Sequence, residues 1–278
     1  MIKSKAEIPP LRRACLLALG KLMKALAPFM DDFVVIGGWA PYLLLSRHGA
    51  DDAVHVGSAD VDLYFDSRRM TPERVHAVMQ ALRKIGSEPM YWMGVGPYIP
   101  FSFWIPVRQQ GEVVKVRVDL LGLENVPAKS LPSHFALALR AAEDVEVQVR
   151  GAAYSVKVSG AVAVLAMKAA VLTERRADKD AYDLYTLVRY YKTGPAALAE
   201  EIKPLRDGPP IKSALKTLRK WFIVPDAPGP LAVARFVAPN GTQAARRVLA
   251  EQVRLTFEML LEGAEGGAGE GQEKQGAG

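Results

Sequence analysis

The sequence predicts an α+β fold, in which a mixed β-sheet flanked by helices is followed by a mainly helical C-terminal domain. Two observations lead to this prediction. Short runs rich in β-branched and aromatic residues, broken by turn signals such as Gln110-Gly111, are concentrated between residues 33 and 158. Beyond Ser159 the apolar residues recur at helical spacing. We therefore expect a first domain over residues 1–158, a helical domain over residues 159–262, and a disordered Gly/Glu-rich tail over residues 263–278.

Each element is expected from its local pattern. Leu11, Cys15, Leu19 and Leu22 recur at helical spacing, which predicts a first helix over residues 9–27. Strands are expected where polar and apolar residues alternate or where a short apolar run ends at glycine. The remaining elements expected in chain order are a strand over residues 33–36, a helix over 39–47, a strand over 60–65, a helix over 71–84, strands over 89–93, 98–107 and 112–121, strands near 145–149 and 154–158, and a helix over 160–176.

The composition is that of an ordinary globular protein. Half of the 278 residues are hydrophobic, which suffices for about two domains. No apolar run reaches the roughly 20 residues that a membrane-spanning helix needs, and the N-terminus lacks the apolar stretch of a signal peptide. We therefore expect a cytoplasmic protein without a membrane partner. The single cysteine, Cys15, is expected to be a small core residue.

The charge of the chain favours anionic partners. The net charge is +6, and the last 16 residues hold three glutamates and one lysine, so residues 1–262 carry about +8. Nucleic acids and nucleotides are such partners, although a solvated basic surface explains the charge equally well. Between residues 211 and 222, Lys212, Lys216, Arg219 and Lys220 fall on one helical face. This stripe could follow an RNA backbone, but a solvated helix face is the more frequent explanation.

Three aspartates are candidates for a metal site. Residues two apart in a strand point the same way, so Asp60 and Asp62 share one face while Val61 faces the core. Oxygen ligands suit Mg²⁺ or Mn²⁺, which would offset the repulsion between the two carboxylates. Asp119 alternates with valines on a later strand and would complete a three-carboxylate site for phosphoryl transfer. A lone D-x-D pair is also typical of the solvated face of an edge strand.

A candidate phosphate-binding turn lies upstream of these aspartates. Gly37-Gly38 ends a strand and precedes a helix, and glycines let a backbone approach phosphate at a helix N-terminus. Ser58 adds a hydroxyl donor two residues before Asp60. The competing interpretation of the glycines is an ordinary strand-to-helix turn.

Together, Gly37-Gly38 and the run from Ser58 to Leu63 resemble the signature of the nucleotidyltransferase superfamily related to DNA polymerase β. The resemblance implies a nucleotidyltransferase fold for the first domain. It also implies that Asp60 and Asp62 bind the metals and the nucleoside triphosphate, and that Asp119 activates the acceptor hydroxyl.

A second group of residues is expected in the helical domain. Lys168 lies inside an apolar helix stripe, where an unpaired ammonium would be costly. Asp180 and Asp183 border the apolar stripe of the next helix and would approach this lysine if the two helices pair. A salt bridge that links the helices is a strong competing interpretation, and a functional site can coexist with it.

This second group resembles the C-terminal motif of the AbiEii/AbiGii-type nucleotidyltransferase toxins, so that the likeness spans roughly residues 33–190. The resemblance implies that Lys168 and Asp180 are needed for activity, with Lys168 as a ligand of the triphosphate. The doubled Arg175-Arg176 leaves the arginine of the motif ambiguous.

The sequence therefore predicts a metal-dependent enzyme that transfers a nucleoside monophosphate from a triphosphate to a hydroxyl. The expected acceptor is RNA, tRNA in particular, and the expected setting is the toxin half of a toxin–antitoxin or phage-defence pair, with a cognate antitoxin as a partner. One alternative is the same chemistry on a small molecule such as an aminoglycoside. Another is a catalytically silent nucleotide-binding module.

Overall fold

The structure, a computed structural model, describes residues 10–50, 55–91, 98–123, 133–175 and 178–266. The contacts within the chain divide it into two units, Met1–Val164 and Leu165–Gly278. Each unit is described by itself below.

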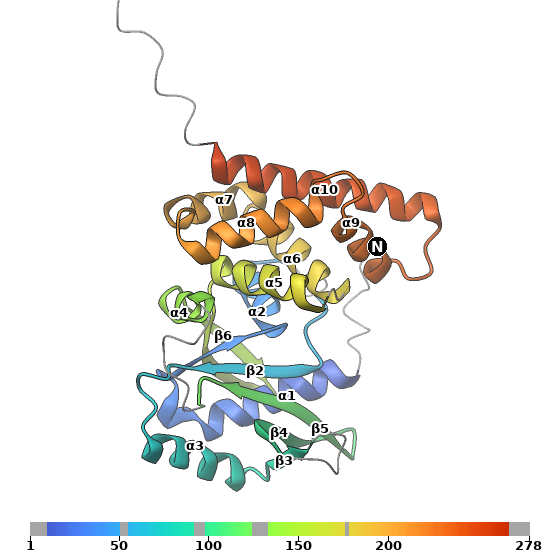
Figure 1. The fold of residues 1–278 in the computed structure, drawn as a ribbon. Helices are drawn as coiled ribbons and strands as arrows, with labels where there is room; N and C mark the ends of the chain where they lie inside the picture. The colour runs from blue at the N-terminus through green and yellow to red at the C-terminus, as the bar shows by residue number, and fades with distance from the viewer. Residues whose placement is uncertain (1–9, 51–54, 92–97, 124–132, 176–177, 267–278) are drawn as a thin grey trace, which may run out of the picture. The chain divides into compact units, whose positions relative to one another are not determined.

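The first unit is built on a seven-stranded mixed sheet, as expected from the sequence. Its strands are β1 (Phe33–Ile36), β2 (Asp60–Phe65), β3 (Glu88–Tyr91), β4 (Tyr98–Gln109), β5 (Glu112–Leu121), β6 (Glu143–Val149) and β7 (Ala152–Val158). Their order is β3-β4-β5-β2-β1-β7-β6. Figure 1 labels these strands except β1 and β7. Strand β2 is parallel to β5 and antiparallel to β1, and β1 is parallel to β7. The central position of β2 puts the Asp60–Asp62 segment in the middle of the sheet.

A two-residue turn sets the register of the β4–β5 hairpin. Gln110 and Gly111 both have positive φ, 51° and 89°, the conformation of a type I′ turn whose twist matches that of the flanking strands. Gln109 therefore pairs with Glu112, and the same register places Ser102 opposite Asp119.

Helices cover both faces of this sheet. They are α1 (Pro10–Ala25), α2 (Trp39–Arg47), α3 (Pro72–Lys84) and α4 (Ser133–Arg140), with a 3₁₀ turn at Ala27–Phe29. Helix α1 contacts β2 and β5, whose side chains Val61 and Val118 are fully buried. On the other face, Phe135 of α4 stacks on Tyr64 of β2 with ring centroids 4.7 Å apart. Helix α4 was not anticipated from the sequence.

Cys15 of α1 is fully buried, as the sequence predicts. Its burial and the nearby negative charge of Asp60 raise the pKa of the Cys15 thiol to about 12. The thiol is therefore a neutral core group at physiological pH and not an activated nucleophile.

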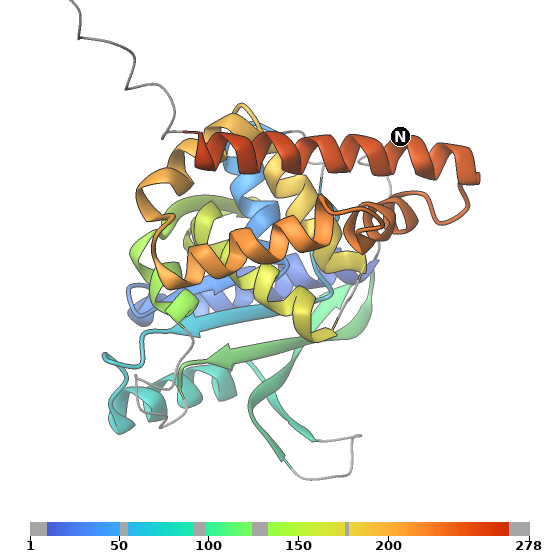
Figure 2. The same cartoon turned by 45° about the horizontal axis from the view of Figure 1, so that its top comes forward.

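The second unit is helical. Its helices are α5 (Ala161–Arg175, which begins in the first unit), α6 (Asp178–Tyr190), α7 (Pro195–Ile202), α8 (Pro209–Phe222), α9 (Pro228–Val237) and α10 (Gln243–Glu265), with a 3₁₀ turn at Lys203–Leu205. Helix α6 is the core of the unit, because its residues 180–188 are all buried and it contacts α9 and α10 (Figure 2). Phe222 of α8 stacks on Phe257 of α10 with centroids 3.7 Å apart. No helix in the described ranges is both long and apolar enough to cross a membrane.

Helix α10 extends further than the sequence suggests. Disorder was expected from residue 263, but the helix continues to Glu265 because Ala264 is fully buried against the unit. Residues 267–278 of the expected tail lie outside the described residues.

Replacing Leu63 by alanine tests the importance of the buried face of β2. Leu63 is fully buried, so the cavity left by Leu63→Ala should lower the free energy of unfolding by about 2–5 kcal/mol. Val113→Ala is the control, because Val113 is 56% exposed on β5 and its truncation should change stability by less than about 0.5 kcal/mol. Urea denaturation followed by circular dichroism measures both. Equal losses in the two variants would contradict this assignment of the core.

Candidate active site

The three candidate carboxylates lie on one face of the sheet. Asp62 of β2 is in register with Asp119 of β5, and Asp60 is in register with Arg117. Paired residues of neighbouring strands point to the same face, so all four side chains share the face opposite Val61. The three aspartates are half-buried. The structure thus brings together the carboxylates that the sequence singles out.

Gly37 lets Asp62 lie against the backbone that follows β1. Gly37 has a φ of +66°, which favours glycine, and a Cβ atom at this position would lie only 1.9 Å from Oδ2 of Asp62. Gly38 follows as the N-cap of α2, and no side chain of the described residues caps this helix end. The backbone N–H groups and the dipole of a helix favour an anion at its N-terminus. The two glycines therefore have different roles: Gly37 makes room for the carboxylate, and Gly38 opens the helix N-terminus.

Ser58 contacts a carboxylate in this structure. Its hydroxyl donates a hydrogen bond of 2.6 Å to Oδ1 of Asp60. Ser58 is buried, so this bond fixes the orientation of the Asp60 side chain. The sequence suggests Ser58 as a phosphate ligand, and this stays a prediction; in this structure the hydroxyl is bonded to Asp60.

Asp119 is held by two donors. The Arg117 guanidinium lies 2.7 Å from Oδ2 of Asp119, and the Ser102 hydroxyl donates to Oδ1 over 2.7 Å. Partial burial works against the charged form of Arg117, but the hydrogen bond to Asp119 and the charges of Asp119, Asp60 and Asp62 raise the pKa of Arg117. Arg117 is therefore the internal counter-charge of the carboxylate face.

Sequence reasoning did not assign roles to Arg117 and Ser102, although both leave a signal. Arg117 lies two residues before Asp119 and so shares its face of β5. Ser102 follows from the Gln110-Gly111 turn, because counting pairs back from a two-residue hairpin gives the partner of Asp119 directly.

The donor set suits a hard divalent cation. Asp60, Asp62 and Asp119 offer only oxygen atoms, as Mg²⁺ and Mn²⁺ prefer. Within the described ranges, no three histidine, cysteine, aspartate or glutamate side chains are already arranged as a metal-binding group. In this structure Arg117 and Ser102 are bonded to Asp119, and Ser58 is bonded to Asp60. The three aspartates therefore have the ligand atoms that such a cation prefers and lie on one face of the sheet. Arg117 would compete with the cation for Asp119.

The second group of candidate residues lies in the helical unit. Lys168 of α5 is buried and donates to Asp180 over 2.8 Å and to Asp183 over 2.6 Å, both on α6. Burial works against the ammonium, but the charges of Asp183 and Asp180 and these hydrogen bonds raise the pKa of Lys168. Lys179 adds a second bond to Asp183, of 2.9 Å. The cluster links α5 to α6, as the salt-bridge interpretation expects.

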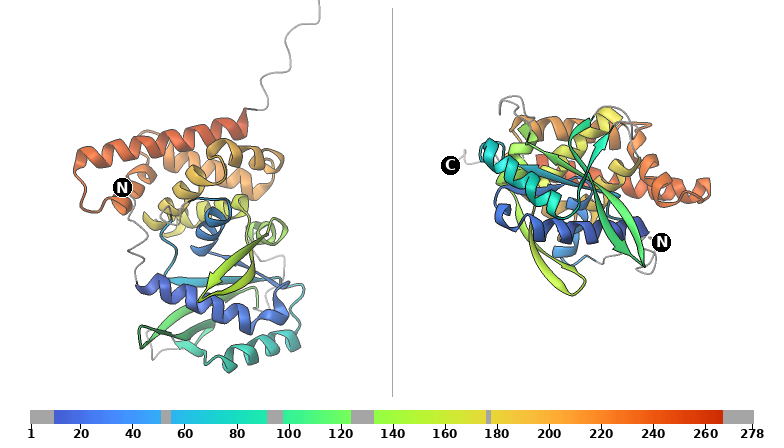
Figure 3. Two further views of the ribbon diagram at one scale, coloured as in Figure 1. Left: turned by 180° about the vertical axis from the view of Figure 1, so that it is seen from behind. Right: turned by 90° about the horizontal axis from the view of Figure 1, so that it is seen from below.

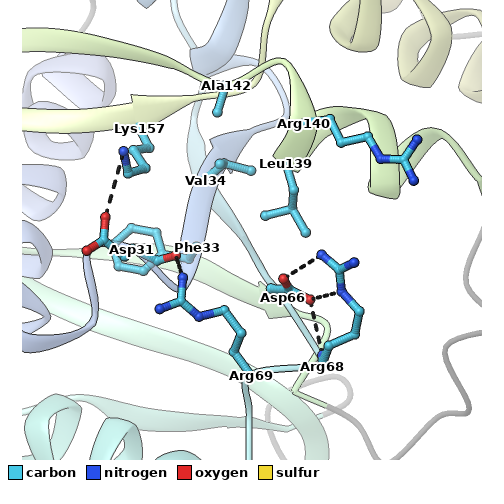
Figure 4. A pocket seen from close by; sticks show the side chains of 10 residues that line it. All are labelled: Asp31, Phe33, Val34, Asp66, Arg68, Arg69, Leu139, Arg140, Ala142 and Lys157. Atoms are coloured by element: carbon cyan, nitrogen blue, oxygen red, sulfur yellow. Dashed lines mark hydrogen bonds and ion pairs between the residues drawn. The ribbon is translucent and has the colours of Figure 1, made fainter.

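A cavity of about 430 Å³ lies at the opposite end of β1 and β2 from the carboxylates (Figure 4). Its acidic residues are paired: Asp66 binds Arg68 at 2.7 Å, and Asp31 lies 3.7 Å from Lys157. Asp66 follows Phe65, which pairs with Phe33, whereas Asp62 pairs with Ile36 at the other end of the strands. This cavity is therefore separate from the site around Asp62.

Gly37→Ala tests the close approach between Gly37 and Asp62. Gly49→Ala is the matched control, because Gly49 has a φ of +80° and a Cβ there would meet nothing within 4 Å. Both variants should lose about 1–2 kcal/mol from the strained conformation. Only Gly37→Ala must also displace a carboxylate, so it should lose at least about 1 kcal/mol more in urea denaturation. Equal losses would show that the approach is unimportant.

Lys168→Met tests the buried cluster. The substitution leaves Asp180 and Asp183 buried without the Lys168 ammonium, which should cost about 3–5 kcal/mol. Lys212→Met on the exposed face of α8 serves as the control and should change stability by less than about 0.5 kcal/mol. Thermal denaturation at constant pH compares the two variants. A Lys168→Met protein as stable as the control would exclude a structural role for the cluster.

Comparison with a solved structure supports a nucleotidyltransferase-like fold for this chain. A nucleotidyltransferase-like antigenic protein from Paracoccidioides brasiliensis is similar, with a TM-score of 0.50, 20% identity, and coverage of 76% of this chain and 90% of that one. The antibiotic-resistance factor ANT(2'')-Ia is more distant, with a TM-score of 0.33, 14% identity, and coverage of 90% and 96%. No curated protein sequence is significantly similar.

A protein-family comparison identifies the chain more directly. The model of the family described as "Nucleotidyl transferase AbiEii toxin, Type IV TA system" matches residues 21–228, about three quarters of the chain. Its match includes Gly37, Asp60, Asp62, Asp119 and Lys168. The chain therefore belongs to the AbiEii nucleotidyltransferase toxin family of type IV toxin–antitoxin systems.

Proposed function

We propose that the protein transfers a nucleoside monophosphate from a nucleoside triphosphate to a hydroxyl of RNA, with tRNA as the acceptor and pyrophosphate as the leaving group. The observation that carries the proposal is the parallel register of β2 and β5, which pairs Asp62 with Asp119 and leaves Asp60 on the same face. Membership of a nucleotidyltransferase toxin family supports the reaction class. The basic charge of the chain supports a polyanionic acceptor.

In this proposal Asp60 and Asp62 hold divalent metal, with Asp119 as a third ligand and as the acceptor of the proton from the attacking hydroxyl. Bound Mg²⁺ would neutralise charge on the phosphate oxygens. Ser58 orients the Asp60 carboxylate through its 2.6 Å hydrogen bond. Gly37 and Gly38 present the backbone and the N-terminus of α2 to the triphosphate.

The α5–α6 cluster would support the reaction from the helical unit. We propose that Lys168 offsets negative charge on the triphosphate and that Asp180 positions its ammonium, since Asp180 accepts a hydrogen bond of 2.8 Å from it. Asp183 shares this task while it is also bonded to Lys179. A lysine held from two sides keeps its charge in a fixed place, which is what electrostatic catalysis requires.

The proposed partners follow from this chemistry. A nucleoside triphosphate is the donor, and RNA is the acceptor. A cognate antitoxin is proposed as the third partner, because the family is that of type IV toxin–antitoxin systems. We propose the cytoplasm as the place of action, since the proposed donor and acceptor both occur there.

Asp60→Asn tests the carboxylate face. The protein would be incubated with Mg²⁺, total tRNA and each labelled nucleoside triphosphate in turn. We expect label in RNA with at least one triphosphate, and a loss of about a thousandfold in Asp60→Asn, the scale for a group that acts on transition-state charge. Asp144→Asn on β6 is the control, because Asp144 is exposed and its substitution removes the same charge elsewhere on the sheet.

Two results would contradict the proposal. One is the absence of labelled RNA with all four triphosphates. The other is equal labelling by the wild-type protein and by Asp60→Asn. Label on an aminoglycoside instead of RNA would move the proposal to small-molecule acceptors.

A further inference from the structure

A basic groove runs beside α1 on the first unit, and none of the three candidate aspartates lines it. It consists of two adjoining cavities of about 500 and 330 Å³ that share Leu17, Val149 and Arg150. Its walls are α1, the end of the β4–β5 hairpin and the end of the β6–β7 hairpin. Figure 3 shows α1 and these two hairpins from behind and from below. We call this feature the α1 groove.

The charge of the α1 groove has one sign. Five cationic side chains line it, and no acidic residue does so in the part of the chain that the structure describes. They are Arg13, Lys21 and Lys24 from α1, Arg108 from β4 and Arg150 from the β6–β7 turn. The cavity of Figure 4 is different, because two acidic residues line it, and Asp66 pairs with Arg68 while Asp31 pairs with Lys157.

These cations are available to a ligand. Arg13, Lys24 and Arg108 are exposed, and none of them has an anionic partner among the described residues. Lys21 donates to the carbonyl oxygen of Pro106 over 2.8 Å, and Arg150 donates to that of Arg108. Backbone carbonyl groups fix these two side chains without neutralising their charge. Five like charges in one groove repel each other, and an extended anion would relieve that repulsion.

We propose that the α1 groove binds the phosphodiester backbone of RNA. Arg13 and Lys24 are 11 residues apart on α1, or about 16 Å along a helix axis, a length that spans several phosphates of one strand. The exposed amide of Gln110 can donate hydrogen bonds to ribose hydroxyls or accept hydrogen bonds from them. Among the described residues, Tyr154 is the only aromatic one that lines the groove, whereas protein-binding patches are rich in aromatic anchors. The choice of RNA over other polyanions rests on the proposed function.

The groove begins close to the segment that leads into β2. At the start of α1, Cδ of Arg12 lies 3.3 Å from the position of a Cβ on Gly57, one residue before Ser58. Arg13 follows directly, and the groove then extends along α1 toward Lys24. An RNA held there would lie along α1, and one of its ends would approach the start of β2, where Asp60 lies.

The salt dependence of RNA binding tests the α1 groove. The probe is a fluorescein-labelled RNA duplex with a single-stranded 3′ end, titrated with the full chain between 50 and 200 mM KCl. The groove variant is Lys24→Ala with Arg108→Ala, which leaves the Arg108 carbonyl in place. The control is Arg83→Ala with Lys84→Ala, an exposed pair of the same residue types at the end of α3. Circular dichroism verifies that both variants are folded.

Loss of two phosphate contacts should reduce the slope of log affinity against log salt by about 1.5 in the groove variant. The ratio of the wild-type RNA affinity to that of the groove variant should therefore fall about eightfold between 50 and 200 mM KCl. The control should keep the wild-type slope. Equal slopes in both variants would overturn the proposal. So would a groove variant that loses affinity for poly-L-glutamate but not for RNA, because the groove would then serve an acidic protein.

The proposal for the groove and the proposal for the reaction can be rejected independently. Asp60→Asn should bind the RNA probe with the wild-type slope, since Asp60 lies outside the groove. A reduced slope in the groove variant without any labelling of tRNA would uphold the groove and reject the reaction. Labelling of tRNA together with a wild-type slope in the groove variant would uphold the reaction and reject the groove.

Discussion

The parallel register between β2 and β5 is the constraint on which the candidate site depends. It sets Asp62 beside Asp119, and a shift by one residue would bring Val118 beside Asp62 and turn Asp119 toward α1. The buried residues on the other face, such as Val61 and Val118, prevent that shift because they would lose their place in the core. The packing that stabilises the sheet therefore also places the carboxylates.

Two aspartate clusters of the chain are neutralised in different ways. Arg117, which faces Asp119, is 42% exposed, so water and a competing cation can reach the pair and its separation costs little. Lys168 is only 9% exposed and bridges two buried aspartates, so breaking these ion pairs would leave buried charges that water cannot reach. The first pair suits a site that must exchange its counter-charge for a ligand. The second suits a permanent link between α5 and α6.

Local patterns allowed much of the fold to be predicted from the sequence. Strands β2 and β5 have the expected bounds, because polar and apolar residues alternate along them without interruption. The parallel pairing of these strands is not visible locally, since more than 40 residues separate them and no short turn fixes their register. The closeness of Gly37 to Asp62 depends on another pairing that no short turn fixes, the antiparallel pairing of β1 with β2 that sets Ile36 opposite Asp62. The hydrogen bond from Ser102 to Asp119, in contrast, was predictable from the hairpin turn.

The burial of Cys15 gives the chain an internal reporter. It is the only cysteine, it belongs to the first unit, and α1 must leave the sheet before a reagent can reach its sulfur. The rate at which a thiol reagent modifies the native protein therefore measures the opening of the sheet-bearing unit alone, whatever the helical unit does. Partial unfolding of the two units can thus be resolved without an engineered label.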